Sequence, residues 1–138
     1  MSFARRVVFD TGVLVSAAIL PESIPALALE KALLHFELCV SDATLAELES
    51  VLGRRKFDRY AVPALRQSFI AGYRRHACLV SVTQMVADCA DAADNKFLAL
   101  AEAASAELIV ASDPHLTVLN PWRGIPIVPP AAFLAVIR

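Results

Sequence analysis

Four carboxylic acids stand where an α/β fold would expose them, and together they suggest metal chemistry. Asp10 ends one apolar run, Asp113 follows another, and Glu47 and Asp94 lie in segments with helical character. In open α/β sheets the ligand crevice lies at the carboxyl ends of the strands. Carboxylates gathered there repel one another unless they are protonated or bridged by cations, and hard oxygen ligands suit Mg²⁺ or Mn²⁺. The four acids therefore point to metal-assisted phosphodiester chemistry.

Each of these acids also has a purely structural interpretation. Asp10 can cap the helix that follows it, and Asp113 can initiate a turn. Glu47 can be a solvated acid at the edge of an apolar helical stripe. Asp91 and Asp94, three residues apart, can cap the next helix and stabilise its positive end, which is compatible with binding a cation. For Asp10 alone, capping and function are equally open.

Charge is unevenly distributed along the chain. Residues 54–75 are basic with Asp58 as the only acid, whereas residues 88–113 are acidic with Lys96 as the only cation. An acidic metal pocket beside a basic segment suits a nucleic acid, because arginines would hold the phosphates that flank the scissile one. A solvated basic face is an equally open interpretation. The candidate RNA-binding residues are Arg54, Arg55, Lys56 and Arg59.

Length and composition predict one compact domain spanning residues 1–138. The apolar fraction of 57% predicts a sizeable core, and the net charge of −1 gives no global attraction for a polyanion. Three cysteines without a CxxC spacing indicate free thiols in a reducing cytoplasm. The three histidines are not spaced as a metal cluster, and we interpret His115 as a surface residue. No apolar run reaches the ~18 residues of a membrane span, and none near the start resembles a signal peptide.

Strands and helices are expected to alternate. Short apolar runs predict strands at residues 6–10, 38–40, 78–82 and 107–111, with an edge strand at 127–128. Helical periodicity, caps and prolines predict helices at residues 11–19, 26–36, 43–52, 63–76, 95–106 and 130–137. Alternation of this kind implies an α/β fold with a parallel sheet and right-handed crossovers.

Four segments resemble the motifs of PIN-domain proteins, in order and over nearly the whole chain. Residues 8–17 (VFDTGVLVSA) resemble the family's opening strand followed by Asp-Thr-Asn, and residues 41–57 (SDATLAELESVLGRRKF) resemble the second motif with its Glu. Residues 91–101 (DAADNKFLALA) are similar to the third, acidic motif, and residues 108–116 (LIVASDPHL) to the fourth. Each motif is weak alone, but the set is specific. The group most resembled is that of bacterial toxins in toxin–antitoxin pairs, related to the VapC toxins.

The resemblance implies a Mg²⁺- or Mn²⁺-dependent endoribonuclease on a parallel, five-stranded, three-layer α/β/α sandwich. It makes Asp10, Glu47, Asp94 and Asp113 the acidic quartet of the catalytic and metal site. It makes Thr11, Asp91 and Ser112 supporting residues. It further implies an RNA substrate, a small antitoxin partner and a homodimer.

Two motifs depart from the family pattern. Gly12 stands where the family usually has Asn, so one amide beside Asp10 is lost. The fourth motif usually reads Thr-Gly-Asp-x-Asp, whereas residues 111–115 read Ala-Ser-Asp-Pro-His, which replaces the second acid by His115. These departures keep open a second hypothesis, a weakly active or non-catalytic module that binds RNA or protein.

Two other acid-dependent folds fit less well. Haloacid-dehalogenase-like phosphatases carry a second Asp two residues after the first, where this chain has Gly12. A receiver-type signalling domain would need paired acids after the first strand and a Lys after the last. Residues 10–12 and 126–138 provide neither.

Overall fold

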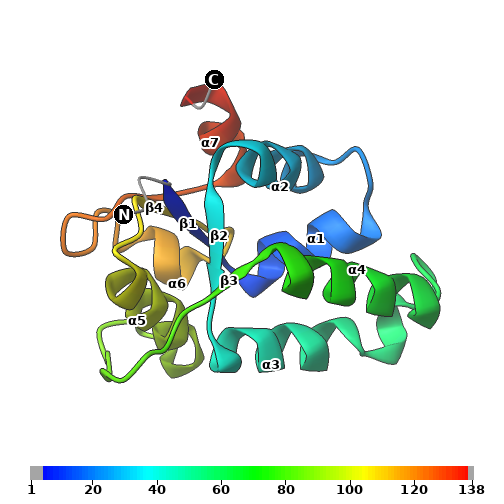
Figure 1. The fold of residues 1–138 in the computed structure, drawn as a ribbon, viewed down its shortest axis with the longest axis horizontal. Helices are drawn as coiled ribbons and strands as arrows, with labels where there is room; N and C mark the ends of the chain where they lie inside the picture. Colours follow the sequence, from blue (N-terminus) through cyan, green and yellow to red (C-terminus); the bar gives the residue numbers. More distant parts are fainter. Residues whose placement is uncertain (1–4, 137–138) are drawn as a thin grey trace.

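A five-stranded parallel sheet forms the centre of the molecule. The computed structural model describes residues 5–136 (Figure 1). The strand order is β3-β2-β1-β4-β5, and every neighbouring pair is parallel. The strands are β1 (Arg6–Phe9), β2 (Glu37–Val40), β3 (Cys78–Leu79), β4 (Leu108–Val110) and β5 (Ile127–Val128). The sequence predicted all five, including the edge position of the last one.

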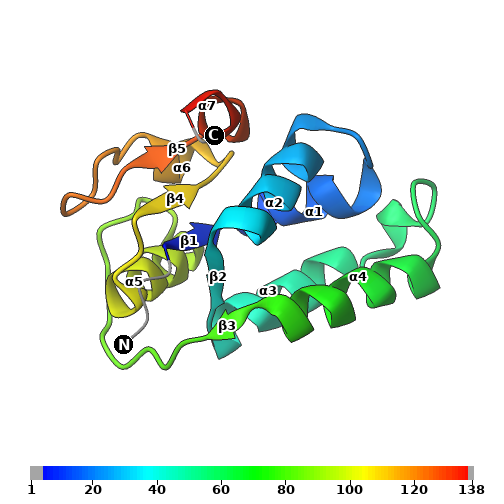
Figure 2. The same cartoon turned by 45° about the horizontal axis from the view of Figure 1, so that its top comes forward.

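Helices cover both faces of the sheet (Figures 1 and 2). They are α1 (Thr11–Ile19), α2 (Ile24–His35), α3 (Asp42–Leu52), α4 (Pro63–His76), α5 (Asn95–Ala104), α6 (Pro114–Thr117) and α7 (Pro130–Val136). Short 3-10 turns, η1 (Arg55–Phe57) and η2 (Ala92–Asp94), precede α4 and α5. Residue 137, the predicted end of the last helix, lies outside the described residues.

Alternating strand residues feed two separate cores. Val7 and Phe9 of β1 pack with α1, α2, α3, α4 and α7. Val8 of β1 and Ile109 of β4 pack with α5 and α6 on the other face. Successive strand side chains point to opposite faces, so buried strands become apolar throughout. The predicted three-layer α/β/α sandwich is confirmed.

Local capping explains where most helices begin. Asp10 caps α1 by accepting the Val13 N–H, and Ser23 caps α2 through the Ala26 N–H. Ser41 and Thr44 form a reciprocal capping box at the start of α3. These caps place the first turns of α1 and α3 directly after β1 and β2, at the carboxyl end of the sheet.

The structure differs from the predicted elements in several places, of which three have a clear physical reason or add an element. β3 ends at Leu79 rather than residue 82, because its partner β2 ends at Val40 and the chain beyond has no strand to pair with. α5 ends at Ala104 because Ser105 adopts a left-handed conformation (φ 51°) that caps the helix. The short helix α6 was predicted only as a turn.

Among residues 5–136, no single helix is long and apolar enough to cross a membrane. α1 and α2 meet the length and composition criteria only as a pair, and they are bent by 106° relative to each other.

Candidate active site

A cleft of about 480 Å³ opens at the carboxyl ends of β1 and β4, and all four predicted acids line it. β1 and β4 are adjacent, so Asp10 and Asp113 reach the same edge of the sheet. Glu47 comes from the middle of α3, and Asp94 from the start of α5. The supporting residues Thr11, Asp91 and Ser112 line the same cleft. The structure therefore brings together every acid that the sequence proposed.

Asp10 is almost fully buried and uses both carboxylate oxygens on backbone donors. Oδ1 accepts the Val13 N–H at 2.9 Å, while Oδ2 accepts the N–H groups of Ser112 and Asp113 at 3.0 and 3.3 Å. Burial raises the pKa of Asp10, and these backbone hydrogen bonds act in the opposite direction. Asp10 thus links the end of β1 to the turn after β4.

Glu47 is also held by two partners. Its Oε2 accepts the Thr11 hydroxyl at 2.5 Å, and its Oε1 lies 2.8 Å from the Lys96 ammonium. Thr11 is the first residue of α1 and Lys96 is in the first turn of α5. The Glu47 side chain therefore connects three helices beside the cleft, and no pattern in the sequence predicted its contact with Lys96.

Asp94 is buried, yet its Oδ2 has no hydrogen-bond partner. It occupies the N-cap position of α5 without making a side-chain capping bond. Asp91 caps the preceding turn η2 instead, through the Ala93 N–H at 3.0 Å. Burial, followed by the neighbouring Asp113 carboxyl, raises the pKa of Asp94 to about 7. A buried oxygen without a donor is costly unless a ligand satisfies it.

Asp113 faces Asp94 across the cleft and is fixed by the start of α6. Its Oδ1 accepts the His115 backbone N–H at 2.8 Å and lies 3.3 Å from His115 Nδ1. Burial acts to raise the pKa of Asp113, but the adjacent Asp94 carboxyl and the contacts with His115 outweigh it, and the pKa lies below its usual range. The pKa values of the two neighbouring acids are therefore shifted in opposite directions, upward for Asp94 and downward for Asp113.

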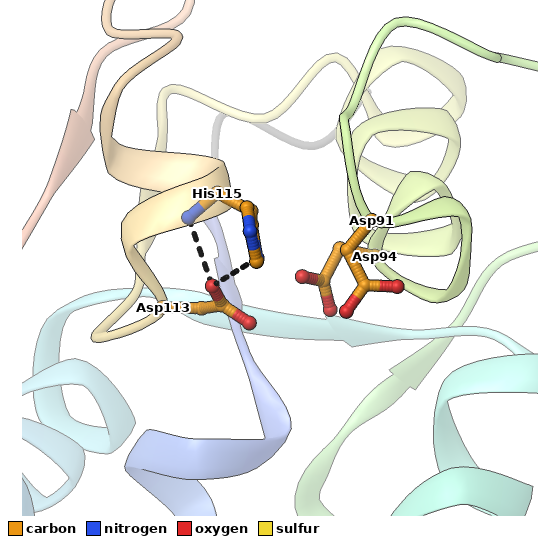
Figure 3. A group of neighbouring side chains, drawn as sticks. All are labelled: Asp91, Asp94, Asp113 and His115. Carbon is orange, nitrogen blue, oxygen red and sulfur yellow. Dashed lines mark hydrogen bonds and ion pairs between the residues drawn. The ribbon is translucent and has the colours of Figure 1, made fainter.

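Four side chains can hold one metal ion. One ligand atom each of Asp91, Asp94, Asp113 and His115 lies within 4.8 Å of the others (Figure 3). Asp91 and Asp94 project from the start of α5 toward Asp113 and His115, which lie at the start of α6. The partnerless Asp94 oxygen in this group fits a divalent cation, which would supply the missing contact. We interpreted His115 as a surface residue, and it is exposed, but its ring, at the start of α6, also lies within reach of the three acids.

The predicted RNA-binding residues lie outside the cleft. Arg54, Arg55, Lys56 and Arg59 are exposed in and around η1, and none lines the cleft, whose wall includes Val51 near the end of α3. Buried Arg66 of α4 holds this segment by donating to the carbonyls of Leu52, Arg54 and Ala61, and it pairs with Asp58. The segment is thus ordered by a basic residue that is not itself available to a ligand.

A family model described as PIN domain matches residues 6–115. The chain belongs to the PIN domain family. This PIN domain also resembles a chain in the crystal structure of VapBC2 from Rickettsia felis bound to a DNA fragment from their promoter, with a TM-score of 0.60 and 13% sequence identity. That match covers 88% of this chain and 96% of the other, and at this identity it shows a shared fold. Comparison with curated proteins gives no match.

Gly12 and Ser112, which belong to the two motifs that depart from the family pattern, lie next to each other. A Cβ atom placed on Gly12 would lie 2.9 Å from the Ser112 hydroxyl and 3.7 Å from Asp10 Oδ1. The Ser112 side chain therefore occupies space next to Gly12 that any larger residue there would need. Both residues line the cleft.

Proposed function

We propose that this PIN domain is a metal-dependent endoribonuclease. The observation that carries the proposal is the partnerless, buried Asp94 Oδ2 beside Asp91, Asp113 and His115. Like charges so close together are stable only when protonated or bridged by a cation. Membership of the PIN domain family supports phosphodiester hydrolysis as the use of that cation.

Each of the four acids has a role that follows from its contacts. Asp94 and Asp113 would hold the cation, Mg²⁺ or Mn²⁺, with Asp91 at its open side. Asp10 fixes the turn that carries Asp113, and Glu47 holds Thr11 and Lys96 at the rim. When bound, the cation supplies a positive charge for the scissile phosphate and lowers the pKa of a water molecule.

We further propose that the protein is the toxin of a toxin–antitoxin pair. The fold similarity to a chain in the VapBC2 structure supports a small antitoxin as partner. A homodimer is the assembly that we expect. The exposed basic residues Arg54, Arg55, Lys56 and Arg59 would hold RNA phosphates that flank the cleaved one.

Cleavage of single-stranded RNA with and without divalent metal tests the proposal. We expect cleavage in Mg²⁺ or Mn²⁺, none in EDTA, and none by Asp94→Asn or Asp113→Asn protein with either metal. Single-stranded DNA of the same sequence tests the choice of nucleic acid. Metal-independent cleavage, or cleavage that survives both substitutions, would refute the assignment.

A non-catalytic PIN-like module that binds RNA or protein is the second candidate. One observation favours it: both carboxylate oxygens of Asp10 and both of Glu47 already accept hydrogen bonds from other residues of the protein. RNA binding without turnover in the same assay would select this function instead.

A further inference from the structure

The backbone of His115 is held in place beside Asp91, Asp94 and Asp113, the other members of the candidate metal site. Its backbone N–H donates to Asp113 Oδ1, and its carbonyl accepts the thiol of buried Cys89 at 3.4 Å. The Cys89 N–H in turn donates to Asn95 Oδ1 at 2.8 Å, at the start of α5. These bonds tie the α6 turn, with Asp113 and His115, to the segment that carries Asp91 and Asp94. The two halves of the group are therefore connected before any ion binds.

The donor set of this group differs from an all-carboxylate site. Three carboxylates and one imidazole lie within reach of a single ion. Mg²⁺ is a hard cation that takes oxygen ligands and retains several waters. Mn²⁺ shares its preference for carboxylates but, as a first-row transition metal, it accepts an imidazole nitrogen more readily than Mg²⁺ does. A second observation points to a ligand here. Asp94 is only 8% exposed, and its Oδ2 has no partner.

We propose that the His115 ring nitrogen is a ligand of the bound cation and makes this site select Mn²⁺ over Mg²⁺. The inference rests on the proposed function, because it concerns the same cation. It adds a residue that sets the identity of the ion. His115 and the three acids then form one mixed nitrogen and oxygen site, in which the imidazole is exposed.

Equilibrium binding of Mn²⁺, followed by the EPR signal of the free ion, tests the selectivity. Mg²⁺ affinity is measured by competition. We expect wild-type protein to bind Mn²⁺ at least about tenfold more tightly than Mg²⁺. Loss of a residue that only supports a metal ligand already changes metal affinity by about this factor, so a direct ligand should have at least this effect. His115→Asp replaces the imidazole by a carboxylate and should lower the ratio of the Mn²⁺ affinity to the Mg²⁺ affinity, whereas an unchanged ratio would contradict the role of His115.

Pulsed EPR of the Mn²⁺-loaded protein reports the ligand directly. A nitrogen hyperfine coupling should be present in wild type and absent in His115→Asp and His115→Gln. His35→Gln is the matched control, because His35 is an exposed histidine at the end of α2, next to the amino end of β2. The control should retain both the coupling and the selectivity.

The outcomes separate the inference from the function on which it rests. Equal affinity of the wild type for both ions, or no nitrogen coupling, would overturn the role of His115 and leave a metal nuclease in place. Failure of the wild type to bind either ion would overturn both. Asp94→Asn should lose both ions, which shows that the binding measured is at this site.

Discussion

Asp10 and Asp94 are both buried acids of the cleft, but their hydrogen bonds are opposite in kind. Asp10 accepts three backbone N–H groups, and Asp94 Oδ2 accepts none. In Asp10→Asn, one carboxylate oxygen becomes an NH₂ group that faces an N–H donor. We expect this variant to lose about 1–3 kcal/mol of stability, the cost of a buried donor left unpaired.

Asp94→Asn should behave differently without metal. At pH 8 it removes a buried charge that lies close to Asp113, so the metal-free variant should be as stable as wild type or more so. Urea denaturation of both variants in EDTA measures the contrast. If Asp94→Asn lost as much free energy of unfolding as Asp10→Asn, the predicted difference between the two acids would be contradicted. Asp94→Asn is thus the better variant for testing catalysis in a folded protein.

The raised pKa of Asp94 predicts the pH dependence of stability. The unfolded acid titrates near its ordinary value of 3.8, and the folded acid near 7. Between these values the folded state holds a proton that the unfolded state has released. The metal-free protein should therefore become less stable as pH rises from about 4 to about 7. The lowered pKa of Asp113 has the opposite effect on the pH dependence of stability. Asp113 stabilises the folded protein at pH values above its ordinary pKa of 3.8, and this contribution is lost as the pH falls below that value.

Melting temperatures in EDTA across this pH range measure the effect. The decrease of the melting temperature with pH should be smaller in Asp94→Asn than in wild type. Part of the decrease should remain, because the pKa of Asp10 is also raised. Metal affinity should change in the other direction and increase as pH rises toward 7, because a ligand must lose its proton to bind. A wild-type melting temperature that rises with pH in EDTA would contradict the assignment.

At the scale of elements, the segment around η1 is organised by α4. Arg66 is buried and donates to three backbone carbonyls of residues 52–61, so the exposed Arg54 and Arg55 are free of that structural task. Replacing both by Ala should leave the free energy of unfolding nearly unchanged.

The same double variant should weaken RNA binding. Its log–log salt dependence should flatten by about one to two units, because each phosphate contact contributes close to one. Arg75→Ala, an exposed basic residue of α4, serves as a control. An unchanged salt dependence in the double variant would identify the segment as a solvated face or a docking surface for an acidic partner.

At the scale of the whole molecule, α2 carries much of the exposed apolar surface. Within the described residues, Ile24, Leu27, Leu33 and Leu34 are large, exposed apolar residues of this helix, and Leu34 is 80% exposed. Such a patch on a small protein is typical of an interface. We expect a dimer at micromolar concentration by light scattering, and a monomer for Leu34→Glu.

Met85→Glu is the matched control for the dimer, because Met85 is 99% exposed and lies between β3 and η2. It should remain a dimer. A wild-type protein that is monomeric throughout the micromolar range would rule out the homodimer.

The sequence by itself determined the succession of strands and helices along the chain, the parallel sheet and the four acids at its carboxyl edge. These follow from local patterns, because apolar runs, caps and prolines act over a few residues. Because Asp10 ends an apolar run and Asp113 follows another, the fold class places both acids at the same edge of the sheet, and the pairing of β1 with β4 makes them neighbours. Only the tertiary structure decided which contacts each acid makes and which acids remain available to a metal ion. The backbone donors to Asp10, the Lys96 contact of Glu47 and the turn that brings His115 to Asp94 join residues far apart in sequence, and local patterns carry no information about such contacts.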